Sequence, residues 1–478
     1  MTAPAIGATG ADAAHVLVFG ISGATWSIID PMLRAGELPV LAGLCARGVR
    51  ATLTSRPTAG DHYPRPQTAW ATIATGCGPE RHGVTRFYHE GADLRERPIW
   101  ALYAERGLRV GMFGWPGTWP PPVVDGFVVP SHLARDTRTW PAELGWIKGI
   151  EQRYQAGERG ARSGARISRT TREAASFLRT AEAPLRSSVR IAATAVAAAR
   201  SRPEERALLL RYARLDMTTA LFAGLLRRYR PHLAAYVTFL VDFASHRYWH
   251  YMDSIDAPPR LSRAVREAYA RTEAALGRLL RSLPSDSTVF VLSEHGMAPE
   301  PDSAELGDTR YLLDGRAIAA LAGLPPDTVV CPIARWIAYR SLSGHVGEEA
   351  ASLLKCIVVV ETGRPLLSVH RNGVAEVVVR LSLPPELPRY REGGLDRLTV
   401  ACGDRRVGFL DVARPAGRVR SAMHDQDAVL VAAGPRIRRG GDAGVGSLED
   451  VLPTVLRAAG LAPPAALDGR ALEHVLAD

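Results

Sequence analysis

Lysine is almost absent from this chain of 478 residues: all but two of its 59 basic residues are arginines. The formal net charge of +10 would suit a nucleic acid or a membrane surface as a partner. The arginines, however, are scattered along the chain instead of gathered into a stripe, and a GC-rich genome produces the same bias. We therefore expect no nucleic-acid polymer as a partner.

Long apolar runs and paired cysteines are lacking as well. No stretch reaches the length of about 18 uncharged apolar residues that a membrane-spanning helix needs. Residues 1–14 have neither the basic start nor the apolar run of a secretory signal, and we expect them to be disordered. The five cysteines are far apart and never spaced as CxxC, which argues against disulfides and a thiolate zinc site. These absences favour a cytoplasmic protein that is not attached to a membrane.

Short apolar strands alternate with helical patterns in residues 15–139, which is typical of a mostly parallel sheet. The pattern returns in 233–306 and 419–478, so these three segments are expected to form one α/β core. Between them, 140–232 is rich in arginine and alanine at helical spacing, which indicates a helical insertion or lid. Its arginines would form a solvated face or grip an anionic substrate. Residues 307–418 are interpreted as an α+β insertion or cap.

Acidic side chains and histidines coincide at three predicted strand boundaries. Asp242 and His246 follow the run AAYVTFLV, Glu294 and His295 follow STVFVLS, and His424 precedes AVLVAAG. Since the carboxyl ends of strands form the crevice of an open α/β sheet, these side chains are expected to converge there. Carboxylate oxygens and imidazole nitrogens are the ligands of zinc and manganese sites. One such fragment alone would equally suit a surface pair, but three together favour a metal site.

These fragments resemble the alkaline phosphatase superfamily, specifically its type I phosphodiesterase/nucleotide pyrophosphatase branch. The resemblance covers roughly residues 15–135, 235–300 and 420–475, and includes LPVLAGLCARGV, AWATIATGCGPERHGV, WPGTWPPPVVDGFVVP and SLEDVLPTVLRAAGLAPPAALDGRAL. It implies an alkaline-phosphatase-like fold and a two-metal site where a serine or threonine attacks phosphorus. The residues that it places around the first metal ion, Zn²⁺ or Mn²⁺, are Asp242, His246 and His424.

The second metal site is where the chain departs from this family. The resemblance implies a carboxylate in a GIDG turn, but the chain has GISG, with Ser22 at that position. The family's Asp-His pair is replaced by Glu294 and His295, whose carboxylate reaches about 1.5 Å further from the backbone. The nucleophile is expected nine residues before Thr75, and Pro66 occupies that place. Two elements of the second site are therefore missing and one is altered.

Nearby residues offer replacements for these lost groups. Thr68 is two residues from the nucleophile position, although in a helix it would point roughly 200° away from Pro66. Asp61 and His62 lie in a loop that would supply a ligand or a base. Ser22 itself would donate a hydrogen bond to a substrate oxygen. The sequence therefore leaves Ser22, Thr68 and Glu294 as candidate catalytic residues.

Two functions follow from these observations. The first is a metal-dependent hydrolase or transferase that acts on a phosphate ester or diester of a small anionic molecule or nucleotide. One ion would activate water for direct attack, while Glu294 and His295 hold a weak second ion or act as acid and base. The alternative is a catalytically inactive pseudoenzyme kept as a binding or regulatory module, since Ser22 and Pro66 occur together. The inserted segments carry no recognition motif that identifies a substrate.

Overall fold

The computed structural model describes residues 13–58, 63–85, 89–158, 167–300, 311–326, 328–333, 336–340, 347–371, 376–382, 394–415 and 421–477. The chain divides into two compact units, Met1–Ala298 with Ala422–Asp478 and Pro299–Ser421. Among the described residues, no helix combines the length and the apolar character that crossing a membrane would need.

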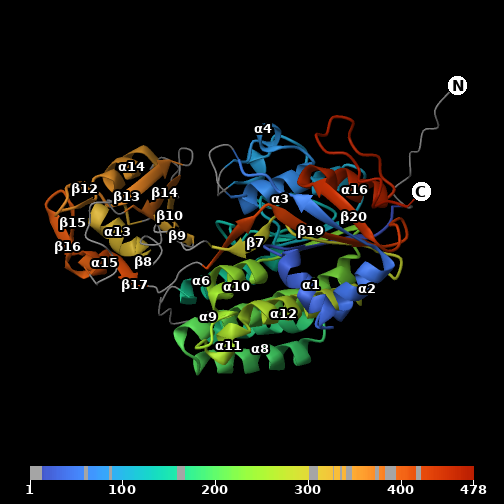
Figure 1. The fold of residues 1–478 in the computed structure, drawn as a ribbon, viewed down its shortest axis with the longest axis horizontal. Helices are drawn as coiled ribbons and strands as arrows, with labels where there is room; N and C mark the ends of the chain where they lie inside the picture. Colours follow the sequence, from blue (N-terminus) through green and yellow to red (C-terminus); the bar gives the residue numbers. More distant parts are fainter. Residues whose placement is uncertain are drawn as a thin grey trace. The chain divides into compact units, whose positions relative to one another are not determined.

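Eight strands form one mostly parallel sheet at the centre of the larger unit (Figure 1). One strand, the third in the order given below, is antiparallel to both of its neighbours. All other neighbouring strands of this sheet are parallel. This arrangement confirms the predicted α/β class. In order across the sheet the strands are β20 (Asp442–Ser447), β2 (Val49–Thr54), the antiparallel β19 (Asp427–Ala433), β6 (Thr288–Leu292), β1 (Val16–Ile21), β5 (Leu233–Thr238), β3 (Val110–Phe113) and β4 (Gly126–Val129).

Helices cover both faces of the sheet because successive side chains of each strand point to opposite faces. In β1, Leu17 and Phe19 belong to one apolar core, whereas Val16 and Val18 belong to the other. Figure 1 shows the two helical layers. The first contains α1 (Trp26–Arg34), α2 (Pro39–Arg47), α6 (Gly145–Glu158), α9 (Pro203–Tyr229), α10 (Leu240–Tyr248) and α12 (Ala264–Leu280), and the second contains α3 (Pro66–Thr75), α5 (Ile99–Ala104) and α16 (Val451–Ala458).

The described residues of the arginine-rich segment 140–232 are mostly helical, and its last helix belongs to the core. In α9, Leu208, Phe222 and Leu225 are fully buried in the same cluster as Phe19 of β1. This helix therefore covers the sheet, although the boundaries of the expected insertions stay predictions. The other α-helices described in this unit are α4 (Pro79–His82), α7 (Ile167–Thr180), α8 (Pro184–Ala199), which packs on α9, and α11 (Pro259–Ser262).

The apolar run AAYVTFLV changes from strand to helix within itself. β5 ends at Thr238 and α10 begins at Leu240, so Asp242 and His246 lie in a helix and not directly after a strand. The apolar character of the run cannot reveal this change, because both segments are buried. Because residues four apart lie on one face of a helix, this helix places Asp242 and His246 side by side, which favours a common site.

The smaller unit has a separate apolar core that includes Ile318, Leu354 and Val379. Its two four-stranded sheets are built from antiparallel pairs. The first sheet contains β13 (Leu367–Arg371), β14 (Glu376–Leu381), β10 (Trp336–Arg340) and β9 (Val329–Ile333), and the second β12 (Arg364–Pro365), β11 (Val358–Val359), β15 (Thr399–Cys402) and β16 (Arg405–Gly408). The remaining elements are the pair β8 (Tyr311–Leu313) and β17 (Ala413–Pro415), with α13 (Gly315–Ala322), α14 (Gly347–Lys355) and α15 (Phe409–Val412).

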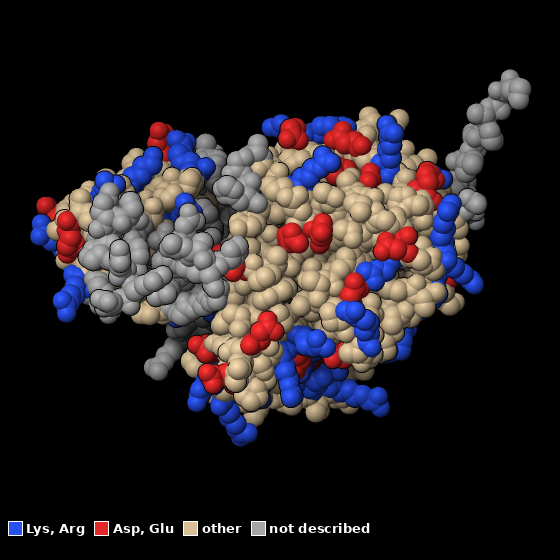
Figure 2. All heavy atoms as spheres, viewed as in Figure 1, with Lys and Arg blue, Asp and Glu red and all other residues tan. Residues whose placement is uncertain are grey.

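Charges of both signs share the surface. Figure 2 shows blue lysine and arginine side chains interspersed with red aspartate and glutamate on the face in view. Several arginines are paired, for example Arg50 with Asp30 and Arg260 with Glu205. Part of the formal positive charge is thus balanced locally.

His82 is a buried histidine that links α3 and α4. Its Nδ1 accepts a hydrogen bond from the Val84 N–H, so in the neutral ring Nε2 carries the proton and donates to Thr72 Oγ1, 3.0 Å away. Burial lowers the pKa of His82 to about 4. The folded chain therefore keeps this ring neutral at a pH where the unfolded chain protonates it.

We expect this histidine to make folding sensitive to acid. Between its unfolded pKa near 6.5 and its folded value, the unfolded state binds more protons, so stability falls as the pH falls. In His82→Gln, the slope of the unfolding free energy against pH should decrease by about 1.4 kcal/mol per pH unit. Urea unfolding at several pH values from 7 to 4 measures this slope.

His474→Gln, which replaces an exposed histidine, is the control for the substitution itself. An unchanged slope in His82→Gln would contradict the assignment of a neutral buried ring.

Candidate metal centre

The predicted ligand residues meet at one edge of the central sheet. Ser22 lies in a turn after β1. Its N–H donates a hydrogen bond to Thr238 O, and its carbonyl accepts one from Asp242 N–H. Gly23 follows with φ +74°, and a Cβ there would lie 3.1 Å from the Asp242 Cα. Only glycine lets this turn approach the start of α10 so closely without strain. The remaining residues come from two further places: Glu294 and His295 follow β6, and His424 lies in β18 (Ala422–Asp425), which pairs with β7 (Gly296–Pro299).

Asp242, His246 and His424 form a compact cluster. The two Nε2 atoms of His246 and His424 are 3.0 Å apart. Asp242 Oδ1 lies 3.3 Å from the first and 3.6 Å from the second. The three side chains are between 11% and 19% exposed, so the cluster is largely but not completely buried.

Main-chain carbonyls fix the orientation of both imidazoles. His246 Nδ1 lies 2.7 Å from Ala422 O, and His424 Nδ1 lies 2.8 Å from Pro64 O. Because a carbonyl oxygen only accepts hydrogen bonds, each Nδ1 must carry the proton and donate it. In a neutral ring each Nε2 then presents a lone pair, so two lone pairs and a carboxylate oxygen face a common point.

The charges of the cluster also suit a cation. Burial alone would raise the pKa of Asp242, but His246 and His424 beside it hold that pKa well below its usual value. Burial, together with the neighbouring His295, lowers the pKa of His424 to about 3. At neutral pH the cluster therefore contains an ionised carboxylate and a neutral His424, as metal ligation requires.

The donor set and its spacing fit zinc. A tetrahedral zinc ion with bonds of about 2.0–2.1 Å needs ligand atoms about 3.3 Å apart. The three separations in the cluster, from 3.0 to 3.6 Å, bracket this value. Two imidazoles and one carboxylate leave a coordination position open, as in catalytic zinc sites, and the same donors are compatible with manganese.

Glu294, His295 and Ser22 form a buried group beside this cluster. All three residues have 0% exposure. Ser22 Oγ donates a hydrogen bond of 2.6 Å to Glu294 Oε1, and His295 Nε2 lies 3.3 Å from the same oxygen. Although burial opposes it, the charge of Glu294 raises the pKa of His295. The His295 ring stacks on His424, with ring centroids 3.9 Å apart. The hydroxyl proton of Ser22 is thus used in the hydrogen bond to Glu294.

Among the described residues, no hydrogen bond joins Pro66 or Thr68 to this cluster, although the Pro64 carbonyl just before α3 accepts one from His424 Nδ1. Pro66 is the first residue of α3, where its fixed φ and missing N–H are well tolerated. Thr68 is buried in the same helix, and its Oγ1 has no hydrogen-bond partner among the described residues. Asp61 and His62 lie outside the described residues.

Some supporting contacts could not be found by reading the sequence. Ser293 Oγ accepts from Val429 N–H and donates to Ala24 O, which ties the ends of three strands together. The carbonyl groups of Pro64 and Ala422 orient the two histidines. Every residue has a main-chain carbonyl, so the sequence cannot show which ones take part. Lys148 is buried, and the rarity of lysine in this chain is the one signal that could have drawn attention to it.

The fold and the cluster define an α/β protein with a candidate catalytic metal site at the carboxyl edge of its sheet. The sequence matches the family profile described as type I phosphodiesterase / nucleotide pyrophosphatase over residues 16–352. The chain belongs to this family, whose members are metal-dependent phosphodiesterase- and pyrophosphatase-type hydrolases. A comparison with curated proteins gives no match.

The Ser22 hydroxyl should stabilise the fold. In Ser22→Ala, Glu294 Oε1 loses the buried donor 2.6 Å away, which should lower the free energy of unfolding by about 1–3 kcal/mol. Denaturant unfolding measures this loss, and Ser27→Ala in the exposed part of α1 is the control. Equal stability of the two variants would contradict a structural role for the hydroxyl.

Proposed function

We propose that this chain hydrolyses or transfers a phosphate ester or diester of a small molecule or nucleotide, with one Zn²⁺ or Mn²⁺ bound to Asp242, His246 and His424. Family membership supports the reaction class. The observation that carries the proposal is the convergence of two Nε2 lone pairs and one carboxylate oxygen on a single point. Two nitrogen lone pairs 3.0 Å apart repel unless a cation lies between them.

The residues of the cluster have separate tasks in this proposal. A bound zinc ion supplies a Lewis acid that polarises a phosphoryl oxygen and lowers the pKa of water. Asp242 provides the negative charge that retains a cation. His246 and His424 are held in one tautomer by their Nδ1 hydrogen bonds, so no reorientation is needed when substrate arrives.

Glu294 and His295 act as positioning residues in this proposal. Their complete burial keeps them from direct contact with a substrate, and Ser22 already occupies Glu294 Oε1. The stacking of His295 on His424 fixes the plane of that ligand. Among the described residues, the groups available to bind a second ion are Glu294, His295 and the neutral Ser22 hydroxyl. Hydroxyls are poor ligands for zinc. We therefore propose a single-metal enzyme.

Removal of one ligand tests the single-metal proposal. His424→Ala should lose the ion and lower kcat/KM at least about a hundredfold, since even the partners of metal ligands contribute 10–100-fold. Elemental mass spectrometry and hydrolysis of a bis(p-nitrophenyl) phosphate probe measure the two effects. The control is His474→Ala on the surface. A His424→Ala protein with full metal content and full turnover would overturn the proposal.

A binding or regulatory module without catalysis is the second candidate. It is favoured by Pro66 at the first position of α3, where the family nucleophile is expected, and by Ser22 in place of a carboxylate.

The double variant Ser22→Asp with Pro66→Thr tests this candidate. If the nucleophile and the carboxylate are all that the chain lacks, the variant should hydrolyse the same diester probe while the natural chain does not. Pro66→Thr alone, which restores the hydroxyl without the ligand, is the control. Turnover by the natural chain at ordinary enzymatic rates would rule the module out.

A further inference from the structure

Helix α8 presents an apolar stripe to solvent. Leu185, Val189 and Val196 are 74%, 71% and 49% exposed. Ala192 and Ala199 are exposed as well, and this spacing keeps all five side chains on one face of a helix. Four of the ten large apolar side chains that are exposed among the described residues lie in α7 and α8. Single exposed apolar residues need no explanation, whereas a continuous stripe indicates a contact surface.

The opposite face of α8 is already packed on α9. Ser187 and Ala198, which lie on that side of the helix, are buried. Arg190 of α8 forms an ion pair of 2.9 Å with Asp216 of α9. Figure 1 shows α8 on the outer side of α9, away from the central sheet. The helix thus has its partner within the fold, and the exposed stripe is an additional surface.

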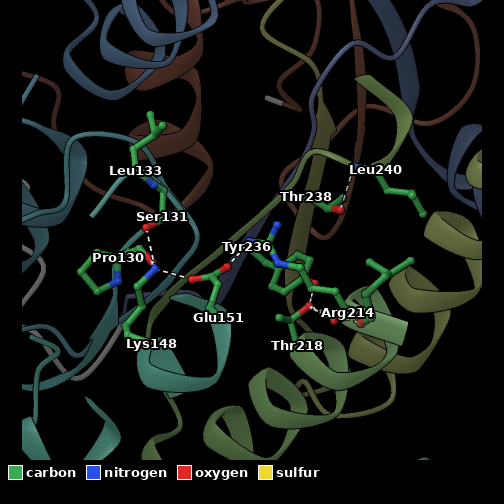
Figure 3. Close-up of polar contacts among 11 residues, drawn as sticks. Pro130, Ser131, Leu133, Lys148, Glu151, Arg214, Thr218, Tyr236, Thr238 and Leu240 are labelled. Carbon is green, nitrogen blue, oxygen red and sulfur yellow. Dashed lines mark hydrogen bonds and ion pairs between the residues drawn. The ribbon is translucent and has the colours of Figure 1, made fainter. Parts of the chain in front are cut away.

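A buried ion network holds α9, the support of α8, to α6. Figure 3 shows Glu151 of α6 between Lys148 of the same helix and Arg214 of α9. Lys148 also donates hydrogen bonds to the carbonyl oxygens of Pro130 and Ser131, at 3.1 and 2.7 Å. Because Lys148 and Glu151 are buried, solvent ions screen their interaction only weakly. The stripe is therefore displayed on an anchored helix pair.

The residues that border the stripe are positively charged. Residues 183–203 contain four arginines and no acidic residue. Of these, Arg190 is paired with α9, whereas Arg186, Arg200 and Arg202 are exposed and form no ion pair with a described residue. Figure 2 shows several blue side chains along the lower margin of the larger unit, where Figure 1 places α8.

The acidic residues that flank this segment in the sequence do not cancel its charge. Glu182 is paired with Arg227 of α9, and Glu205 is paired with Arg260 of α11. Glu204 is the one flanking carboxylate that has no ion pair with a described residue. Three exposed arginines thus accompany one carboxylate, and the segment keeps an excess of positive charge.

An aliphatic stripe bordered by arginines suits an anionic lipid surface. Interfacial helices bury such a stripe at the boundary of headgroups and acyl chains, while their cationic side chains lie among anionic headgroups. The stripe has no aromatic side chain, which is the usual anchor of a protein interface. Arg186 and Arg200 lie on the same side of the stripe. An antiparallel pair of α8 helices from two copies would therefore bring like charges together, which disfavours a second copy as the occupant.

We propose that α8 docks the chain reversibly on an anionic lipid bilayer. Leu185, Val189 and Val196 lie in the bilayer surface in this arrangement, and the guanidinium groups of Arg186 and Arg200 contact the headgroups. The helix lies along the membrane and does not span it. The proposal departs from the expectation of a chain not attached to a membrane, which rested on the lack of a spanning segment and a signal. It uses none of the metal ligands and stands whether or not the chain is a hydrolase.

Sedimentation with lipid vesicles tests this surface. The full chain is mixed with vesicles of equal parts of phosphatidylglycerol and phosphatidylcholine, or of phosphatidylcholine alone, and the bound fraction is measured after centrifugation. We expect binding to the anionic vesicles that weakens as salt is added. Binding to the neutral vesicles should be at least about tenfold weaker, because the arginines then lack anionic headgroups.

The double variant Leu185→Gln with Val189→Gln removes the apolar contact without changing the charge or introducing a poor helix former. It should weaken binding to the anionic vesicles at least about tenfold, since burial of one such side chain contributes about this much. Val445→Gln, which replaces a valine of β20 that is 68% exposed, is the matched control. Arg186→Gln should weaken binding about fivefold. The exposed Arg439 provides its control, Arg439→Gln.

Three outcomes would contradict the proposal. The first is a natural chain that does not bind the anionic vesicles, or binds them no better than the Leu185→Gln, Val189→Gln variant does. The second is a natural chain that sediments as a dimer while this variant is a monomer, because a second copy would then cover the stripe. The third is binding to soluble polyglutamate as tight as to the vesicles, which would identify an acidic protein as the partner. None of these measurements depends on turnover or on a bound metal ion.

Discussion

Two hydrogen bonds to main-chain carbonyls determine the character of the candidate site. Donation from His246 Nδ1 to Ala422 O and from His424 Nδ1 to Pro64 O turns both Nε2 atoms inward. The acceptors belong to β18 and to the segment before α3, so segments far apart in the sequence must meet for the ligand geometry to exist. The cluster is thus a product of the whole α/β core. A small shift of β18 or α10 would separate the lone pairs and remove the site.

The same core accommodates Pro66 and Ser22, the residues at the positions where a nucleophile and a carboxylate were expected. Pro66 suits the first position of α3, and the hydroxyl of Ser22 satisfies Glu294 where a second carboxylate would repel it. Both residues are therefore compatible with the single-metal site of the proposed function. The family match ends at residue 352, yet the third residue of the cluster, His424, comes from beyond it.

The sequence predicted much of this arrangement because strand patterns and acid-histidine fragments are local signals. The run HVLVFGI forms β1, and the placement of Asp242, His246 and His424 near strand ends brought them to one edge. The change from β5 to α10 at Thr238 was missed, since a continuous apolar run hides the transition. The Lys148–Glu151–Arg214 network was missed because Arg214 is distant in sequence and resembles any surface arginine. Burial, which only the fold reveals, separates it from the others.

The number of tightly bound ions per chain tests the central claim most directly. The natural chain would be loaded with zinc, freed of loose ions and weighed intact by native mass spectrometry. The account predicts one ion, because the described residues provide one complete set of ligands, Asp242, His246 and His424. A chain that retains no ion would contradict a metal centre at this edge of the sheet. A chain that retains two would contradict a single-metal site.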